Sequence, residues 1–406
     1  MQILMGLVGI VFVLAVAFIF SENRRAIRLR TVFWAFVLQA GFALFVLYVP
    51  VGQHILMGMS GGVQAVIDSA GDGISFLFGS LAGGDNGFIF AIQVLSVIVF
   101  FSSLVSVLYY LGIMRWVINI LGGGIQKLMG TSRPESLSAA ANIFVGQTEA
   151  PLVIRPFIAN MTRSELFAVM VGGLASVAGG VLAGYAAMGV NLQYLIAASF
   201  MSAPGGLLMA KMMLPETETP QHDTNVSTAE NDEKLANVID AAATGASTGV
   251  QLALNVGGML LAFVSLIALV NAILTGIGGL FGFEDLTLQL ILGYIFSPVA
   301  WLIGVPWSEA VAAGNFIGQK TILNEFVAFA SFTGFEGSLS EHTKAIITFA
   351  LCGFANISSI AILMGGLAVM APSRRGDVAR LGPKAILAGT LSNLMSASLA
   401  GLFLSL

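Results

Sequence analysis

The sequence predicts an all-α, polytopic membrane protein, and three observations support this fold class. Of the 406 residues, 57% are hydrophobic and only 9% are charged, with a mean hydropathy of +0.92. Soluble domains carry about 25% charged residues, so a surface this poor in charge requires lipid as its solvent. No alternating strand pattern recurs, which argues against a membrane β-barrel. The third observation is a pair of similar segments in the two halves of the chain.

Spanning helices are marked by hydrophobic windows of about 20 residues, the length that crosses the hydrocarbon core of a bilayer. The windows predict eight transmembrane helices, at residues 3–20, 31–50, 88–111, 164–189, 193–213, 249–277, 343–371 and 385–405. The first window lacks a basic flank and a clear small-residue cleavage site, so we expect a retained helix rather than a removed signal peptide.

The basic residues set the expected orientation, because Lys and Arg collect on cytoplasmic loops. Four arginines lie in residues 24–30, which puts the first loop in the cytoplasm and the N-terminus outside. Eight crossings then leave only Lys320 and Lys344, of 17 basic residues, on the outer side. We therefore expect a protein of the cytoplasmic (inner) membrane with both termini outside. The expected outer segments carry Asp68, Asp72, Asp85, Glu284, Asp285, Glu336 and Glu341.

Four further segments do not fit simple crossings. Residues 52–82 are rich in glycine and mildly amphipathic, and we expect them at the outer interface. Residues 134–160 and 305–333 are apolar but interrupted by polar groups, and each must enter and leave on one side to keep the charge pattern. They predict two re-entrant hairpins. Residues 215–235 are polar and acidic, and predict a cytoplasmic linker.

An internal repeat is the most informative pattern in the chain. Residues 128–147 (LMGTSRPESLSAAANIFVGQ) resemble residues 302–319 (LIGVPWSEAVAAGNFIGQ), and GLASVAG at 173–179 resembles GFANISS at 353–359. The charge pattern inserts the first copy from inside and the second from outside. Two such units form an inverted-topology repeat, an architecture common among secondary transporters. The alternative is a chance likeness, because small residues are frequent at helix contacts in membranes.

Polar groups gather in the first predicted hairpin, around Gly146. Asn142, Gln147, Thr148 and Glu149 are expensive in hydrocarbon unless they face a partner, a cavity or a substrate. Gly146 interrupts the helix, which leaves backbone groups free at membrane depth, and that is tolerated only beside protein or a wet cavity. The alternative is a hairpin tip that satisfies its own backbone.

The second predicted hairpin and the two interrupted helices carry a matching set. Glu325 is the functional candidate there, whereas we expect Lys320 to pair with a carboxylate or to extend toward the interface. Ser176 and Asn356 lie at the helix interruptions, where oxygen atoms suit a hard cation. Two carboxylates with amides and hydroxyls favour a neutral, multiply hydroxylated solute.

Four long matches make the chain similar to the concentrative nucleoside transporter family, and specifically to its bacterial sodium-coupled members. They are VGQTEAP at 145–151, ASVAGGVLAGY at 175–185, GQKTILNEFVA at 318–328 and CGFANISSIAIL at 352–363. The resemblance implies a homotrimer and an elevator-type mechanism, in which a mobile transport domain moves against a fixed scaffold.

On this resemblance the chain divides into four parts. Residues 1–111 would be mainly scaffold helices, and residues 112–213 would be the first repeat of the transport domain. Residues 214–283 would hold the cytoplasmic linker and a scaffold helix. Residues 284–406 would be the second repeat, again with an interfacial helix, a hairpin, a broken helix and a last helix.

The resemblance also implies the site and its ligands. The substrate would be a nucleoside such as uridine, cytidine or an adenosine-like compound, and the coupling ion would be Na⁺, with no organic cofactor, no nucleic acid partner and no enzymatic activity. The implied substrate-binding residues are Gly146, Gln147, Thr148, Glu149, Val181, Glu325, Phe354, Asn356 and Ser359. The implied sodium ligands are the side chains of Asn142, Thr148 and Ser176 and the carbonyls of Val145 and Val177.

Other functions remain open at this point. Proton coupling is the main alternative, but proton-coupled relatives tend to vary at the positions of Asn142 and Thr148, which this sequence keeps. A carrier of another solute, such as a dicarboxylate, would share the repeat. Paired opposed hairpins argue against a channel, and the absence of HExxH, GxSxG or paired catalytic Asp motifs argues against an intramembrane enzyme.

Overall fold

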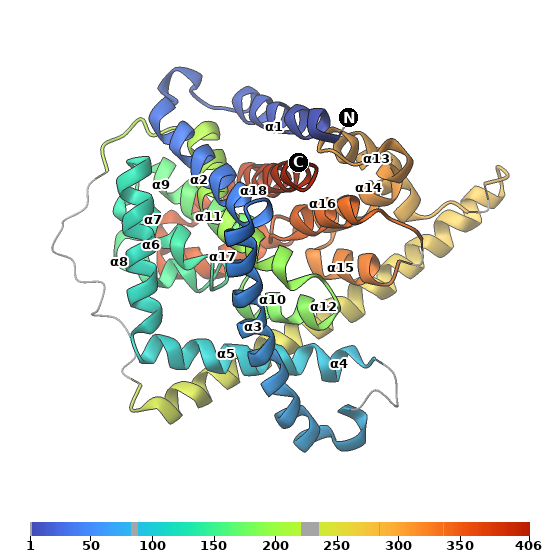
Figure 1. Ribbon diagram of the computed structural model, residues 1–406, viewed down its shortest axis with the longest axis horizontal. Helices are drawn as coiled ribbons and strands as arrows, with labels where there is room; N and C mark the ends of the chain where they lie inside the picture. The colour runs from blue at the N-terminus through green and yellow to red at the C-terminus, as the bar shows by residue number, and fades with distance from the viewer. Residues whose placement is uncertain (1, 83–87, 221–234, 284, 336) are drawn as a thin grey trace.

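The computed structural model describes residues 2–82, 88–220, 235–283, 285–335 and 337–406, and within them the chain is helical without any strand (Figure 1). The expected all-α class is therefore confirmed. The N-terminal helices are α1 (Gln2–Ile19), α2 (Leu29–Leu47), α3 (Pro50–Phe78), α4 (Phe90–Gln93) and α5 (Leu95–Tyr110).

Two series of helices in the same order flank one long helix, α12 (Val238–Gly279). Each series has a leading helix, a two-armed hairpin, a helix with a break and a closing helix. The first consists of α6 (Ile113–Met129), α7 (Arg133–Ala141), the 3-10 helix η4 (Ala150–Ile154), α8 (Arg155–Ile158), α9 (Arg163–Ala175), α10 (Gly179–Ala187) and α11 (Leu192–Met213). The second consists of α13 (Leu288–Leu302), α14 (Trp307–Ile322), α15 (Glu325–Thr333), α16 (Glu341–Leu351), α17 (Ser359–Met370) and α18 (Arg375–Leu404).

Seven helical segments in the described residues are long and apolar enough to cross a membrane. An eighth results only if α13 and α14, which are bent by 115°, are counted together. The expected crossing at 343–371 is two short helices, α16 and α17, separated by residues 352–358, because a hydropathy window averages over such a break. The number of crossings and the re-entrant course of the hairpins stay predictions.

The core lies around α9, α10, α11 and α18. In the most apolar stretch of α11, 94% of the residues are buried, and 83% are buried in α9–α10, against only 6% in α12. A helix that is apolar and yet uncovered must face lipid or another protein chain. The molecule thus has a closely packed interior and one long, open apolar helix beside it.

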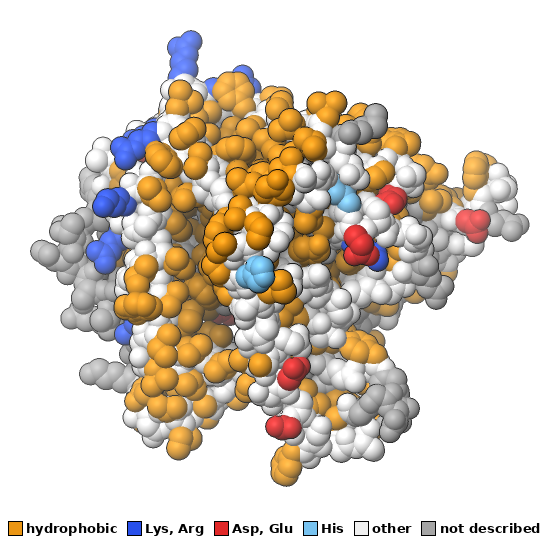
Figure 2. Space-filling view, in the orientation of Figure 1, with side chains coloured by type: hydrophobic (Ala, Val, Ile, Leu, Met, Phe, Trp, Pro, Cys, Tyr) orange, Lys and Arg blue, Asp and Glu red, His pale blue; other side chains and the backbone are white. Residues whose placement is uncertain are grey.

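The surface agrees with a bilayer environment. In Figure 2 hydrophobic side chains cover much of the visible face, whereas Lys and Arg gather at the edge over α2 and α6 and the acidic groups lie toward the opposite edge. The helices α3 and α6 run across the direction of α1, α5 and α18 (Figure 1). The interfacial position of residues 52–82 stays a prediction, although α3 forms one continuous helix through most of that segment.

The two termini lie at the same end of the molecule. A Cβ added to Gly6 of α1 would lie 2.9 Å from the Cβ of Leu402, and one added to Gly9 would lie 2.6 Å from Oγ of Ser398. The first and last long helices are therefore antiparallel neighbours, which places the start of one beside the end of the other. Which side of the membrane this end faces stays a prediction. Most of the expected linker, together with Asp85, Glu284 and Glu336, lies outside the described residues.

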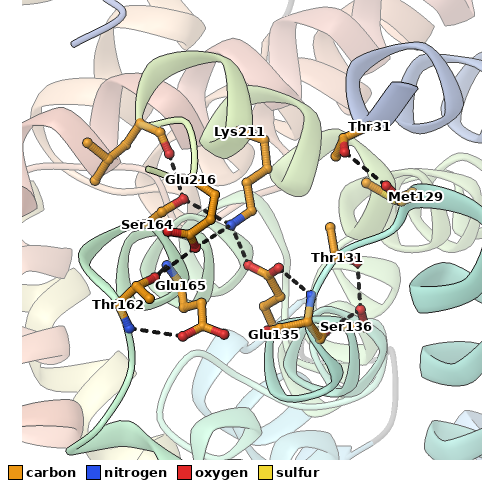
Figure 3. Close-up of polar contacts among 12 residues, drawn as sticks. Thr31, Met129, Thr131, Glu135, Ser136, Thr162, Ser164, Glu165, Lys211 and Glu216 are labelled. Carbon is orange, nitrogen blue, oxygen red and sulfur yellow. Dashed lines mark hydrogen bonds and ion pairs between the residues drawn. The ribbon is translucent and has the colours of Figure 1, made fainter. Parts of the chain in front are cut away.

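A buried ion-pair cluster fixes the base of the first hairpin (Figure 3). Nζ of Lys211, near the end of α11, lies 2.6 Å from Oε2 of Glu135 and 3.9 Å from Oε2 of Glu216. It also donates to Oγ of Ser164 at 2.9 Å. The other oxygen of Glu135 accepts from the backbone N–H of Ser132 and so caps α7. The carboxylates offset the lysine charge where water is excluded.

A cavity of about 180 Å³ lies beside this cluster, between α2, the start of α7 and the end of α11. The hydroxyl of Thr31 donates to the carbonyl of Met129 at 2.9 Å, which joins α2 to the end of α6 (Figure 3). None of the predicted substrate or sodium residues lines this cavity. Its lining is Arg28, Thr31, Gly130, Thr131, Ser132, Glu135, Lys211, Pro215, Glu216 and Pro220.

Candidate functional site

The breaks of the two interrupted helices meet each other. Between α9 and α10 lie residues 176–178, and between α16 and α17 lie residues 352–358. The backbone N–H of Phe354 donates to the carbonyl of Ser176 at 3.1 Å, so the two non-helical segments are in direct contact. Segments about 180 positions apart in the sequence thereby form one structural centre.

Each hairpin is attached to the break that follows it in the chain. The backbone N–H of Gly179 donates to the carbonyl of Phe144 at 3.0 Å in the first repeat. In the second, the N–H of Ile357 donates to the carbonyl of Thr321 at 3.3 Å. A Cβ on Gly179 would lie only 2.8 Å from the Phe144 oxygen, so this approach requires glycine. Both hairpin tips are thus held against the same centre.

A cavity of about 110 Å³ lies at this centre, and all nine predicted substrate residues line it. The four from the first hairpin and Val181 of α10 meet Glu325 of the second hairpin, two residues of the second break and Ser359 at the start of α17. Of the expected sodium ligands, only Thr148 is also in the lining. The further lining residues are Ala178, Leu252, Val256, Met259, Leu260, Asn324, Phe326, Ser358 and Ile362.

Glu325 is a buried polar group of the cavity with a hydrogen bond to each carboxyl oxygen. It is 4% exposed and begins α15, which is capped by the side chain of Asn324. One carboxylate oxygen accepts from the Tyr185 hydroxyl at 3.2 Å, and the other accepts from Nδ2 of Asn356 at 2.9 Å. Two side-chain donors and the start of a helix hold the carboxyl group in place. Such a group can accept further hydrogen bonds from hydroxyl groups of a ligand.

Asn356 organises the second break. Its Oδ1 accepts from the backbone N–H of Ser359 at 3.0 Å and from the hydroxyl of Ser358 at 2.7 Å. The hydroxyl of Ser359 donates to the carbonyl of Phe354 at 2.5 Å. Asn356 therefore connects the carboxylate of Glu325 to the start of α17. The ligand-facing groups on this side are fixed before any ligand arrives.

The first hairpin offers free acceptors instead. Oε1 of Gln147 and Oε2 of Glu149 are buried, and neither has a hydrogen-bond partner among the residues that the structure describes. Buried acceptors without partners cost free energy, so their natural partners are donors that a ligand brings. A Cβ on Gly146 would overlap Oε2 of Glu149, and one on Gly173 would lie 2.8 Å from the Cβ of Gln147. Glycine at both positions allows the two side chains to take these places.

The expected sodium ligands lie behind this tip. Asn142 is 1% exposed, its Nδ2 donates to the carbonyl of Ser138, and its Oδ1 has no hydrogen-bond partner within the described ranges. The hydroxyl of Ser176 donates to the Gly173 carbonyl at a long 3.3 Å. The described residues contain no group of three or more His, Cys, Asp or Glu suited to a metal. A cation held here would therefore be coordinated mainly by neutral oxygens, which suits a hard ion of low charge.

The expectation for Lys320 is wrong. Among the described residues no carboxylate lies within ion-pair distance of its Nζ, and at 1% exposure the side chain does not extend out of the protein. Its Nζ donates to Oδ1 of Asn393 at 2.7 Å and to the carbonyl of Ala350 at 3.3 Å. The physical reason is that the end of α16 presents free carbonyls to the hairpin, and those are good partners for an ammonium group.

Sequence reasoning missed three contributors. Tyr185 belongs to a quoted motif, but its contact with Glu325 is long-range. Asn393 could have been noticed as an amide in an apolar helix, a feature that usually has a role. The apolar wall from α12, with Leu252, Val256 and Met259 among others, leaves no local signal because such residues are ordinary in a membrane helix.

Three models of known protein families match successive parts of the chain. The model described as Na⁺ dependent nucleoside transporter C-terminus matches residues 194–401, and that of the N-terminus matches residues 8–81. A model described as Nucleoside recognition matches residues 91–192.

Full-length relatives and solved structures agree with these matches. The nucleoside permease NupC of Helicobacter pylori is 54% identical, over 99% of this chain and 98% of that protein. The structure of CNTnw in an inward-facing substrate-bound state is 58% identical, with a TM-score of 0.96, over 100% of this chain and 99% of that chain. A doubly substituted CNTnw in an outward-facing state has a TM-score of 0.97 at the same identity and coverage.

Proposed function

Because the chain belongs to the concentrative (Na⁺-dependent) nucleoside transporter family, we propose that it takes up nucleosides across the cytoplasmic membrane by symport with sodium. The observation that carries this proposal is the convergence of both hairpin tips and both helix breaks on one cavity of about 110 Å³. The family is one of transporters and not of enzymes.

The chemistry of the cavity suits the two halves of a nucleoside. We assign the nucleobase to the first hairpin, where Gln147 and Glu149 have acceptors free for the N–H groups of a base. We assign the ribose to the second hairpin, where the carboxyl group of Glu325 offers acceptors for hydroxyl groups and Asn356 and Ser359 line the same wall of the cavity. Gly146, Thr148, Val181 and Phe354 complete the proposed contact surface. A site built around hydroxyl groups should reject deoxygenated analogues, because its buried polar groups would lose their partners.

Sodium coupling would act through the first hairpin. The proposed ligands are the side chains of Asn142, Thr148 and Ser176 with the carbonyls of Val145 and Val177, and the partnerless Oδ1 of Asn142 supports this set. Thr148 lies between Gln147 and Glu149, so an ion bound to Thr148 would order the base-binding side. By linkage, a nucleoside would raise the affinity for sodium by the same factor.

Alternating access would follow the elevator scheme. The domains proposed to move are residues 112–213 and 284–406, against a scaffold drawn from residues 1–111 and 214–283. The buried core and the open helix α12 support a moving body beside a fixed wall. Helix α1 contacts α18, and α2 contacts α11, which favours assigning α1 and α2 to the moving body. Only the later helices of residues 1–111 would then belong to the scaffold. The assembly would be a homotrimer in the inner membrane with both termini outside.

Uptake by reconstituted protein tests the proposal. We expect radiolabelled uridine to accumulate under an inward sodium gradient and not under a potassium gradient. Glu149→Gln and Glu325→Gln should each lower uptake at low uridine by about 10- to 100-fold, the cost of a lost charge-assisted hydrogen bond. Glu341→Gln, which changes an exposed carboxylate at the start of α16, is the matched control and should behave as the wild type. Wild-type uptake by either site variant would remove that residue from the site.

Proton coupling is the second candidate, and the same vesicles distinguish it. Uridine accumulation under an inward proton gradient without sodium would contradict sodium coupling. Competition by succinate instead of uridine would favour a carrier of another solute.

A further inference from the structure

The second hairpin contains a buried cation that the proposed sodium site does not explain. Nζ of Lys320 is enclosed by Oδ1 of Asn393 at 2.7 Å and the carbonyl of Ala350 at 3.3 Å. In the described part of the chain, no carboxylate lies within ion-pair distance of this Nζ. An ammonium group held mainly by neutral oxygens resembles, in its coordination, a bound alkali cation.

The internal repeat assigns this lysine a counterpart. The similar segments end in Gly-Gln at residues 146–147 and 318–319, so the next residue is Thr148 in the first repeat and Lys320 in the second. Thr148 is a proposed sodium ligand. At this matched position the first hairpin has a proposed ligand for an ion from solution, whereas the second hairpin has an ammonium group of its own.

The broken helices give both cations the same kind of environment. The last carbonyls of a helix have no intrahelical donors and carry partial negative charge, which stabilises a cation. Lys320 reaches the end of α16 at Ala350, and the proposed sodium ligand Ser176 directly follows the end of α9. Asn393 joins the two places, because its Nδ2 donates to the carbonyls of Ala175 at 2.7 Å and Cys352 at 2.9 Å.

We propose that Lys320 is the built-in cation of the second hairpin, the counterpart of the sodium ion on the first, and that it positions the tip carrying Glu325. This inference rests on the proposed function. Each hairpin tip then has one carboxylate, Glu149 or Glu325, and one cation, the ion or Lys320. One sodium ion per nucleoside is then enough to give each hairpin tip a cation, because Lys320 supplies the cation of the second tip.

Two substitutions separate the charge of Lys320 from its shape. Lys320→Thr introduces the residue of the first hairpin, whereas Lys320→Met keeps the length without a charge or an oxygen. We expect the Thr variant to bind a second sodium ion, so that the Hill coefficient for sodium in uridine uptake rises from about 1 to about 2. The number of positive charges carried inward with each uridine should rise from about 1 to about 2 as well. We expect the Met variant to lose at least ~10-fold in uridine affinity at every sodium concentration, since sodium has no new ligand there.

Binding should be measured by calorimetry across sodium concentrations, with thermal melting of the same samples. Lys344→Met, which removes an exposed lysine from α16, is the control and should leave the uridine affinity and the melting midpoint unchanged. Uridine affinity of the Met variant equal to or above that of the Thr variant at high sodium would overturn the inference, because packing would then explain the lysine. If the Thr variant does not fold, wild-type affinity in the folded Met variant overturns it equally.

The wild type separates this inference from the function on which it rests. Wild-type protein without sodium-stimulated uridine uptake would reject the proposed function. Wild-type protein with such uptake, together with unaffected Lys320 variants, would reject only the role of Lys320.

Discussion

Lys211 and Lys320 are both buried lysines, but their partners differ in kind. Lys211 at the base of the first hairpin has the carboxylates of Glu135 and Glu216 beside its Nζ (Figure 3). Lys320 at the tip of the second hairpin has an amide oxygen and a backbone carbonyl. The first charge is neutralised where it lies and serves the architecture. The charge of Lys320 has no carboxylate within ion-pair distance in the described part of the chain, and it acts on the carboxyl group of Glu325 over a longer distance.

The largest effect should come from breaking the first cluster. Lys211→Met leaves the buried carboxylate of Glu135 without its cation, which typically costs about 3–5 kcal/mol of stability. We expect a clear drop in the midpoint of thermal unfolding of the purified protein, with and without uridine alike. An unchanged midpoint would mean that the cluster contributes little and that the contrast with Lys320 does not hold.

A smaller loss is expected at the second cluster. Asn393→Ala removes the acceptor for Lys320 and the donor to the carbonyls of Ala175 and Cys352. Buried groups left without partners cost about 1–3 kcal/mol, and here we also expect weaker binding of both uridine and sodium. Calorimetry with each ligand checks this, and a loss of stability with full affinity for both ligands would make Asn393 purely structural.

Removing the first ion pair completely should nearly restore stability. In Lys211→Met with Glu135→Gln, the nearer carboxylate loses its charge together with the lysine, and only Glu216 keeps one, at the longer distance of 3.9 Å and with the Thr162 hydroxyl donating to it at 2.8 Å. We therefore expect an unfolding free energy within about 1–2 kcal/mol of the wild type. The comparison of both single variants and the double variant gives the interaction energy directly. A double variant as unstable as Lys211→Met would contradict the interpretation that Glu135 and Lys211 neutralise each other.

The smallest effect is expected at the surface. Lys344 and Glu341 are 2.8 Å apart on α16 but remain largely exposed. Such pairs contribute about 0–1 kcal/mol, so Lys344→Met should leave the melting midpoint and its response to sodium almost unchanged. A large shift would show that exposure is a poor guide to the role of a lysine in this protein.

Local patterns in the sequence predicted the helical class and the interruptions well. Gly146 and the polar residues that follow it predicted the first tip, and all nine candidate substrate residues line one cavity. The structure extends α12 back to Val238, because the Ala-, Thr- and Ser-rich start of that helix is helical without being strongly hydrophobic. Hydropathy alone placed the start of this helix at residue 249.

The partners of buried charges were beyond the reach of local patterns. Lys320 and Asn393 are separated by 73 positions, and Lys211 and Ser164 by 47. Charge counting placed Lys320 on the outer side and suggested an ion pair or an interfacial position. Only the packing of α14 against α16 and α18 determines that it meets an amide and a helix end instead.

The length of α12 has a mechanical consequence. Its 42 residues, at a rise of about 1.5 Å each, extend roughly twice as far as the 30 Å thickness of a hydrocarbon layer. Its strongly hydrophobic part, residues 249–277, extends roughly 44 Å at the same rise and still exceeds the hydrocarbon thickness, so we expect this part to lie tilted in the bilayer. In the proposed elevator scheme, a tilted α12 would offer the moving domain an apolar surface longer than the membrane is thick, so the part of the cavity wall that α12 provides would stay in place while the substrate changes depth.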